Sequence, residues 1–349
     1  MVEYVVTGDW HLTARHKDWY RWTWLHHFVL YIEKVKPCTL IILGDITEMK
    51  DNHPAELVNL LISYMTSLRE VVPHIYILRG NHDYSDADQT FFEFLDDFPQ
   101  IEFISEPCVM DLKPHLHHTA FIPYAPPSVT KKALVEMSEV EADLELVLSH
   151  NMPIGMRINN RRMEGVALDV LGEWSSNTPV PVLNGHVHVP QKDGNLWCVG
   201  APYPIVFGDD YVPRILTANA SLRIHSTPCL SFAPQVRKRV MRIREPADLV
   251  GGIEEGDHIR VILTLYRSEF GMMQEYLHDI RSICERGSVE LHGFECEKIE
   301  RKKLITPGEV KGTQSAKPGD VFHRFCEDHE ISADLTETGE DLMKEDEEQ

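Results

Sequence analysis

Five short apolar runs in this chain end in the same way, and this repetition restricts the fold more than any other feature. Each run has the length and composition of a buried β-strand, and each is followed at once by Asp, Asn or His. In α/β sheets ligands bind beyond the carboxyl ends of the strands, so residues in these positions converge on one crevice. The residues concerned are Asp9 with His11, Asp45, Asn81 with His82 and Asp83, His150, and His186 with His188.

The donor atoms in this set indicate metal ions. Carboxylates, a carboxamide and imidazoles without sulfur suit manganese, iron or zinc better than magnesium or calcium alone. Asp45 arrives alone at the end of a central strand and is the predicted bridge of a dinuclear site, while Asp9 and His11 are spaced so that both can face one ion. Two neighbouring metal ions hold both oxygens of a phosphate ester and activate water, so we expect phosphoester hydrolysis.

The order of the predicted elements indicates an α/β fold. Asp18 is expected to cap a helix over residues 19–36, Pro54 to begin a second helix that ends before Pro73, and residues 89–97 to form a third. This alternation with strands predicts parallel pairing and right-handed crossovers. A second set of strands packed on the first would make a four-layer α/β/β/α sandwich. These later strands are expected at residues 196–199, 203–207, 214–217 and 222–225.

The last third of the chain predicts a small capping domain, a linker and a tail. A strand at residues 258–265, a helix at 270–284 and a strand at 288–295 would make a compact βαβ unit. Beyond it, a short amphipathic helix is expected around Phe322, and the eleven acidic residues against one lysine from position 327 onward predict disorder. The predicted divisions are 1–245 for the catalytic domain, 246–303 for the capping α+β domain, 304–326 for the linker and helix, and 327–349 for the tail.

The net charge of −21 argues against indiscriminate binding of polyanions, although about half of the excess lies in the predicted tail. Contacts with DNA would therefore depend on local basic groups. Two are candidates, and ordinary solvated surface remains the alternative for both. One is Arg157, Arg161 and Arg162, which follow His150, and the other is the predicted basic strand Arg237-Lys238-Arg239.

Cysteine usage and hydropathy indicate an intracellular protein. The seven cysteines are scattered and never spaced as CxxC, which argues against a disulfide framework or a zinc knuckle. The sequence opens directly into a strand, without the basic segment and cleavage site of a leader, and it contains no apolar run of membrane-spanning length. We expect a cytoplasmic location.

The motifs, taken together, resemble a known superfamily. Their order, GDWH, GD, GNHD, SH and GHVH, is similar to the DxH, GD, GNH(D/E), H and GHxH motifs of calcineurin-like metallophosphoesterases. The resemblance implies that His82 contacts the phosphate or protonates the leaving group, and that Asp83 orients His82. It also implies two metal sites, the first formed by Asp9, His11, Asp45 and His188, and the second by Asp45, Asn81, His150 and His186.

Within the superfamily, the chain resembles DNA repair nucleases of the SbcD type. Residues 9–12 are similar to their DWHLG opening, and residues 200–204 and 207–209 to the segment after their last histidine motif. The resemblance implies a DNA exonuclease or endonuclease subunit that acts in repair and recombination, docks an SbcC-type ATPase through the helix near Phe322, and forms a homodimer. It implies two divalent ions, with Mn²⁺ expected ahead of Mg²⁺, Fe²⁺ or Zn²⁺.

The second motif departs from the nuclease pattern. Relatives usually carry GDxFD or GDxFH, whereas residues 44–48 are Gly-Asp-Ile-Thr-Glu, so any function of the last position passes to Glu48 or is lost. The segment also lacks the DRG continuation of serine/threonine phosphatases. Two alternatives therefore stay open: a phosphodiesterase or phosphatase acting on nucleotides or other small esters, and an inactive scaffold that recruits partners. The complete ligand set argues against the scaffold.

Overall fold

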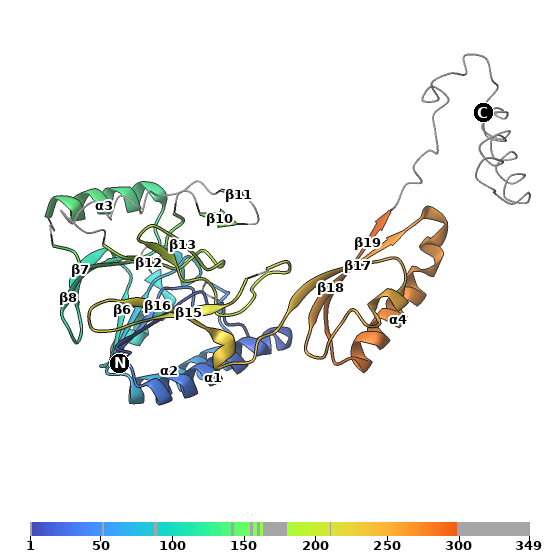
Figure 1. Ribbon diagram of the computed structural model, residues 1–349, viewed down its shortest axis with the longest axis horizontal. Coiled ribbons are helices and arrows are strands. Elements are labelled where there is room, and N and C mark those ends of the chain that lie inside the picture. Colours follow the sequence, from blue (N-terminus) through green and yellow to red (C-terminus); the bar gives the residue numbers. More distant parts are fainter. Residues whose placement is uncertain are drawn as a thin grey trace, which may run out of the picture. The chain divides into compact units, whose positions relative to one another are not determined.

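Two six-stranded sheets form the centre of the fold in the computed structural model (Figure 1). The first has the order β16 (Ile224–Pro228), β15 (Arg214–Ala218), β1 (Tyr4–Thr7), β2 (Thr39–Ile42), β3 (His74–Leu78) and β6 (Ile101–Ile104). The second has the order β13 (Gln191–Asp193), β14 (Leu196–Cys198), β12 (Val182–Asn184), β9 (Leu146–Ser149), β8 (His117–Ile122) and β7 (Cys108–Leu112).

The structure describes residues 2–50, 52–86, 89–140, 143–153, 156–158, 161–162, 180–209 and 211–298. The predicted linker beyond residue 303, the Phe322 helix and the acidic tail lie outside these ranges. The chain divides into two compact units, residues 1–263 with 274–295 and residues 264–273 with 296–349. Our predicted domain limits stay predictions.

The strands that carry the motifs are parallel within each sheet. β1, β2, β3 and β6 pair in parallel, as do β8, β9, β12 and β14, and antiparallel strands occupy the edges. Every residue of β1, β2, β9 and β12 is buried. Continuous apolar runs are the expected sequence of strands that are covered on both faces.

Three clusters of buried apolar side chains demonstrate four layers. The first lies between the first sheet and helices α1 (Trp19–Val35) and α2 (Ala55–Val71), the second between the two sheets, and the third against the outer face of the second sheet, which α3 (Pro127–Val140) covers. The predicted α/β/β/α sandwich is therefore confirmed. The first cluster includes Phe28, Ile42 and Leu61. The second includes Leu78 and Leu148, and the third Met137 and Val147.

Most predicted elements are confirmed, but three details are wrong. Asp18 makes no capping hydrogen bond to α1, because its carboxylate accepts from the Thr13 hydroxyl (3.1 Å) instead. Residues 89–97 form the short strand β5 (Gln89–Thr90) and then the 3-10 helix η2 (Phe91–Asp97) rather than one α-helix. Residues 203–207 form no strand, because the Asp209 carboxylate accepts from the backbone N–H groups of Ile205 (3.0 Å) and Val206 (2.9 Å) and closes a turn.

A third sheet has the order β17 (Lys238–Ile243), β18 (His258–Leu265) and β19 (Glu290–Lys298), with α4 (Met273–Arg286) between the last two strands. The predicted strand, helix and strand of the capping unit are thus present. β17, which we expected within the first domain, pairs in parallel with β18 from Lys238 to Ile243. The basic strand therefore belongs to the small sheet.

The remaining described elements are short. They are the pairs β4 (Tyr84–Asp86) with β5, and β10 (Arg157–Ile158) with β11 (Arg161–Arg162), and the 3-10 helices η1 (His16–Asp18), η4 (Cys229–Ser231), η5 (Pro246–Leu249) and η6 (Arg267–Met272). Among the described residues no helix has both the length and the hydropathy needed to cross a bilayer. The six cysteines in this part of the chain are free, and Cys198, Cys229 and Cys284 are buried.

Candidate active site

The carboxyl ends of five parallel strands bring the predicted residues together. β1 leads to Asp9 and His11, β2 to Asp45, β3 to residues 81–83, β9 to His150 and β12 to His186 and His188. Their donor atoms form groups in which all members lie within 4.8 Å of one another. These groups are Asp9, His11 and His188; Asp45, His150 and His186; and His11, Glu48 and His82.

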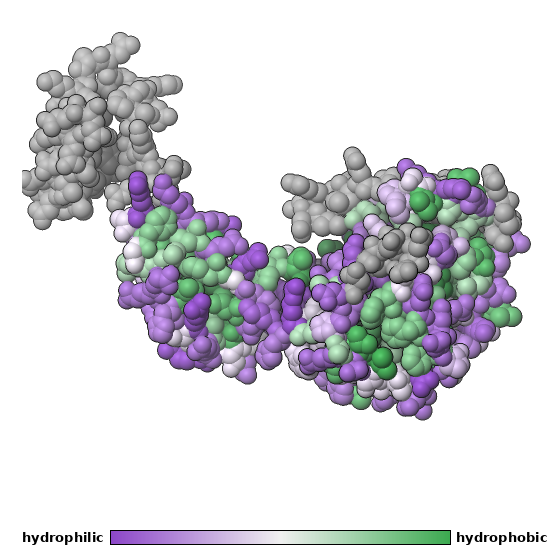
Figure 2. Space-filling model, turned by 180° about the vertical axis from the view of Figure 1, so that it is seen from behind, coloured by the Kyte–Doolittle hydropathy of each residue, from purple (hydrophilic) through white to green (hydrophobic). Residues whose placement is uncertain are grey.

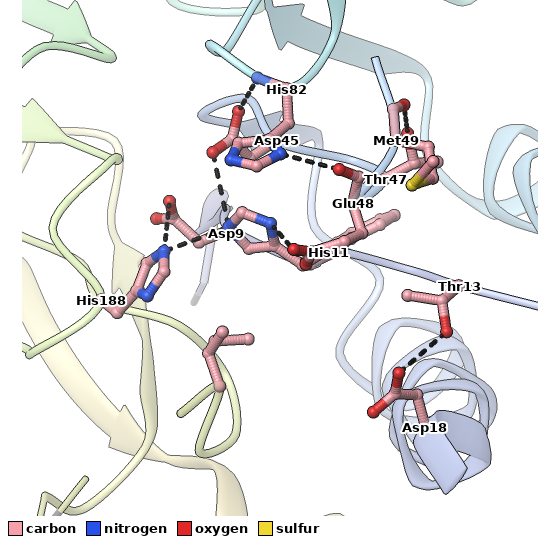
Figure 3. A network of polar contacts seen from close by, with 12 residues as sticks. Asp9, His11, Thr13, Asp18, Asp45, Thr47, Glu48, Met49, His82 and His188 are labelled. Atoms are coloured by element: carbon pink, nitrogen blue, oxygen red, sulfur yellow. Dashed lines mark hydrogen bonds and ion pairs between the residues drawn. The ribbon is translucent and has the colours of Figure 1, made fainter. Parts of the chain in front are cut away.

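Asp45 lies between the first two groups. Its Oδ2 atom is 3.4 Å from Nε2 of His11 in one group and 3.4 Å from Nε2 of His150 in the other. Its Oδ1 atom accepts the backbone N–H of His82 at 2.8 Å (Figure 3). Burial opposes ionisation, but His150 and His11 hold the pKa of Asp45 well below its usual range. An ionised carboxylate with this geometry can serve both groups at once.

The first group contains a buried polar atom that has no partner among the described residues. Oδ1 of Asp9 accepts the backbone N–H of His186 at 3.0 Å, but its Oδ2 atom is buried without a hydrogen-bond partner. Nε2 of His11 faces Nε2 of His188 at 3.1 Å. Burial, followed by the neighbouring His11, lowers the pKa of His188 to about 3, so this imidazole is neutral and offers a lone pair. The orphaned oxygen and the facing nitrogens fit a divalent cation.

The second group converges on the carboxamide of Asn81. Oδ1 of Asn81 lies 2.6 Å from Nδ1 of His186 and 3.2 Å from Nε2 of His150. Nδ1 of His150 contacts the backbone carbonyl of Leu43, which leaves Nε2 for the site. A backbone carbonyl on the outer nitrogen is the usual way in which a protein fixes a metal-binding imidazole. Oxygen and nitrogen donors in both groups can therefore hold a metal ion, and their chemistry does not select one metal.

The backbone that presents these ligands is left-handed at four positions. The φ angles are 53° at Asp9, 44° at His11, 54° at Asp45 and 68° at His186. Such angles cost a non-glycine residue about 1–2 kcal/mol, and they concentrate at functional sites. Backbone hydrogen bonds between the first two motifs hold them, from Asp9 to the Gly44 carbonyl and from His11 to the Asp45 carbonyl, both 2.9 Å long.

The glycine of the third motif is required by close approach. A Cβ atom on Gly80 would lie 2.2 Å from Oδ1 and 2.4 Å from the backbone N of Asp45. No side chain can occupy that space, so the loops after β2 and β3 can approach each other only with glycine at this position.

Asp83 does not orient His82 as we predicted. Its buried carboxylate accepts three backbone N–H groups, from Asp45 (2.7 Å) and Gly80 (2.7 Å) through Oδ2 and from Ile46 (2.9 Å) through Oδ1. Burial raises the pKa of Asp83 to about 6, with the neighbouring Asp45 adding to the effect. Asp83 therefore joins the loop after β3 to the loop after β2 through hydrogen bonds, and these bonds hold Asp45 in place.

His82 is oriented by a different group. Its Nδ1 atom lies 2.8 Å from the backbone carbonyl of Glu48, and its ring stands 4.8 Å from the ring of His11 at an interplanar angle of 78°. A carbonyl only accepts hydrogen bonds, so Nδ1 of His82 carries the proton and Nε2 is the nitrogen that can contact a substrate.

Comparison with known proteins defines the family. The sequence model described as "Calcineurin-like phosphoesterase" matches residues 3–190, which is more than half of the 349 residues. The chain belongs to the calcineurin-like phosphoesterase family. The match covers all five motifs, so the coarser part of our prediction, a metal-dependent phosphoesterase, is supported by the family and by the donor groups together.

The other comparisons found only distant likenesses. No curated protein matches this phosphoesterase. Similar solved structures include the GAP50 anchor in the inner membrane complex of Plasmodium (11% identity, TM-score 0.38), with coverage of 65% of this chain and 88% of that one. Another is the nuclease MPE of Pseudomonas putida (16% identity, TM-score 0.30), with coverage of 64% and 87%. At these scores neither likeness bears on the activity.

Two arginines of the basic strand of the phosphoesterase are paired with one acidic residue. Nε of Arg237 lies 2.7 Å from the Asp257 carboxylate, and the guanidinium of Arg239 lies 3.4 Å from the same group. Lys238 is buried and donates to the Ile205 carbonyl at 2.8 Å. The parallel pairing of β17 with β18 brings Asp257 beside the arginines, and contact of this strand with DNA stays a prediction.

The second basic group lies on a two-stranded ribbon. β10 and β11 pair in antiparallel fashion, with Arg157 opposite Arg162 and Ile158 opposite Arg161. Their contact with DNA stays a prediction. On the face that Figure 2 shows, hydrophilic residues are scattered among apolar ones rather than gathered in one band.

Sequence reasoning missed two residues of the site. Glu48 was noted only as a departure from the nuclease motif, yet its Oε2 atom lies 3.3 Å from Nδ1 of His11. Arg21 belongs to no motif, but it is buried in α1 and donates to the carbonyl of His11. The available signal was the spacing of Arg21, which puts it on the apolar face of the helix with Leu25 and Phe28. Charged residues are rarely buried without a partner, so an arginine at such a position indicates a buried acceptor.

Proposed function

We propose that this phosphoesterase is a DNA nuclease that hydrolyses phosphodiester bonds with two divalent cations. The resemblance to SbcD-type nucleases favours Mn²⁺ over Mg²⁺, Fe²⁺ or Zn²⁺. One observation carries the two-cation part. The Asp45 carboxylate lies 3.4 Å from an imidazole nitrogen in each of the two donor groups. Two such centres can stabilise both the attacking and the leaving oxygen of an in-line displacement at phosphorus.

The residues would divide the work as follows. Asp9, His11 and His188 would hold one cation and Asn81, His150 and His186 the other, with Asp45 shared. The cations supply positive charge that activates water and offsets the charge of the transition state. Nε2 of His82, the nitrogen turned away from the Glu48 carbonyl, is placed to contact the phosphate or to give a proton to the leaving oxygen.

The resemblance of two segments to SbcD-type nucleases supports DNA as the substrate, and in the structure these two segments contact each other. The hydroxyl of Tyr203, in the segment after the last histidine motif, donates to the carbonyl of Trp10 in the first motif. The hydroxyl of Tyr20 donates to the carbonyl of Pro204 at 3.1 Å. The two nuclease-like segments thus form one packed unit beside His11. The missing DRG continuation after Asp45 argues against phosphoproteins as substrates.

The test is cleavage of linear single- and double-stranded DNA with added Mn²⁺, compared with turnover of bis(p-nitrophenyl) phosphate. The nuclease proposal expects DNA cleavage that a chelator abolishes. His82→Ala should lose turnover and keep its bound metal, whereas His225→Ala, which alters an exposed histidine, should match the wild type. Turnover of the small ester without any DNA cleavage would refute the choice of substrate.

A second candidate substrate is a nucleotide or another small phosphoester. The pairing of Arg237 and Arg239 with Asp257 favours it, because it removes one of the two basic groups predicted to grip a phosphate backbone. Hydrolysis of cyclic nucleotides at a higher kcat/KM than any DNA substrate would establish this alternative.

We also propose that an SbcC-type ATPase docks on the helix near Phe322, and that the complex acts in DNA repair. This proposal depends on the sequence resemblance, since the helix lies outside the described residues. Truncation after Ile305 should release the ATPase partner and leave small-ester hydrolysis intact. If the truncated protein still binds the ATPase, the docking site is elsewhere.

A further inference from the structure

Glu48, the last residue of the segment 44–48, lies beside two site histidines at once. Its Oε2 atom lies 3.3 Å from Nδ1 of His11. Its backbone carbonyl lies 2.8 Å from Nδ1 of His82. Figure 3 shows both imidazoles with their Nδ1 atoms toward Glu48. The outer nitrogens of two rings that follow different strands therefore lie against a single residue. Nδ1 of His82 is hydrogen-bonded to the Glu48 carbonyl, whereas Nδ1 of His11 has no hydrogen-bond partner and is at ion-pair distance from the Glu48 carboxylate.

The main chain fixes the place of Glu48. Its backbone N–H donates to the Leu12 carbonyl at 3.1 Å, and Leu12 N–H donates to the Ile46 carbonyl at 2.9 Å. These bonds join the segment after Asp45 to the segment after His11 in a parallel bridge. The carbonyl that meets His82 is thus held by backbone geometry that does not depend on the identity of the side chain.

The side chain is anchored by Arg21. The Arg21 guanidinium lies 3.4 Å from Oε2 of Glu48 and also donates to the backbone carbonyl of His11. Its other terminal nitrogen lies 3.5 Å from the Asp18 carboxylate. Arg21 is 5% exposed, so its guanidinium is a buried cation of α1 and not a mobile surface group. The carboxylate of Glu48 lies between this guanidinium and the ring of His11.

We propose that Glu48 is a positioning residue that fixes the tautomer of His11, so that Nδ1 carries the proton and Nε2 presents its lone pair to the first metal group. This inference rests on the proposed function. A carboxylate on the outer nitrogen of a ligating histidine orients the ring and makes it a better ligand. The side chain thereby sets the affinity of one of the two cations, whereas the backbone carbonyl serves His82.

The same three residues do not form a third cation site. Nδ1 of His82 already meets the Glu48 carbonyl, and Nε2 of His11 faces His188 at 3.1 Å. With Nε2 of His11 turned to the first metal group, a cation bound among His11, Glu48 and His82 would need Nδ1 of His11, which carries the proton in the proposed tautomer. Orientation is therefore the role that the contacts support.

The experiment is calorimetric titration of the metal-free full chain with Mn²⁺ for the wild type, Glu48→Ala, Glu48→Gln and Glu70→Ala. Glu70 is an exposed glutamate of α2 and serves as the matched control. In Glu48→Ala we expect one of the two sites to weaken by roughly 10–100-fold, the usual effect of losing such a partner, and the other to stay close to wild type. Glu48→Gln keeps an acceptor oxygen and should restore most of the affinity.

Turnover gives a second readout. Saturating Mn²⁺ should restore the kcat of Glu48→Ala, because the backbone carbonyl still holds His82 in this variant. A loop that had merely collapsed would not recover, and thermal melting checks that each variant is folded.

The outcomes separate this role from the proposed function. Wild-type affinity at both sites in Glu48→Ala would overturn the positioning role alone, as would a Glu48→Gln variant as weak as Glu48→Ala. If the wild type bound no Mn²⁺, the proposed function would fall and this role with it.

Discussion

Replacing Asp83 by alanine tests whether this carboxylate holds the site together or takes part in a catalytic pair. The substitution would leave the backbone N–H groups of Asp45, Ile46 and Gly80 buried without an acceptor. Each unsatisfied buried donor costs about 1–3 kcal/mol, so the free energy of unfolding should fall by roughly 3–5 kcal/mol after partial relaxation. For a protein of this size the melting temperature should fall by about 4–7 °C.

Asp83→Asn gives a graded comparison. Its single oxygen can accept from two of the three N–H groups, but its amide would then face the third donor. We expect a loss of about 2 kcal/mol, roughly half of the effect of alanine. Asp279→Ala, which removes an exposed carboxylate from α4, is the control and should leave the melting temperature unchanged.

Thermal melting followed by tryptophan fluorescence, together with turnover at saturating Mn²⁺, is the assay. If Asp83 holds Asp45 in place, loss of stability should accompany loss of activity. A variant that melts like the wild type and yet loses activity as fully as His82→Ala would refute this reasoning, and it would restore the pairing with His82 that we first predicted.

Three further predictions follow from contacts of the described residues. Gly80→Ala should lower Mn²⁺ affinity in calorimetry because its Cβ would lie 2.2 Å from Asp45 Oδ1, whereas Gly271→Ala, with no atom within 4 Å of the added carbon, should bind normally. Burial lowers the pKa of Lys238 to about 8 from 10.5, so between these pH values the unfolded chain binds more protons and stability rises with pH. In urea unfolding from pH 8 to 10.5, the wild type should gain up to about 3 kcal/mol relative to Lys238→Met; parallel curves would contradict the shift. Removing metal with a chelator should lower the melting temperature, since a cation at 100 times its Kd adds about 2.7 kcal/mol, and failure of Mn²⁺ to restore it would count against metal binding.

The sequence predicted the layers of the fold, and the meeting of the ligands that follow strands of one sheet, because both depend on local signals. Apolar runs of strand length specify buried parallel strands, and the residue after each strand lies at the carboxyl edge of its own sheet. Asp45 and Asn81 could therefore be placed together without knowing any distance, whereas His150 follows a strand of the second sheet and joins them only because the two sheets pack on each other.

What the sequence could not predict depends on pairing between distant segments. The sequence around Asp83 is the same whether its carboxylate accepts from the His82 imidazole or from the backbone of Asp45. Which partner it takes depends on how closely the loops after β2 and β3 approach each other. The positive charges of Arg237 and Arg239 are visible in the sequence, but their acidic partner is not. Asp257 lies beside them only because of the register in which β17 pairs with β18. Tyr203 lies in an apolar run whose strand formation is prevented by a side chain several residues later.

The four left-handed residues make the metal centre hard to transplant. A designer who copied the seven side chains onto another sheet would reproduce the chemistry of the donors but not their directions, because each Cα–Cβ bond at Asp9, His11, Asp45 and His186 leaves a backbone that ordinary strands and turns do not adopt. A successful graft would have to carry the loops themselves, glycines included, so the smallest portable unit is five strand ends rather than seven amino acids.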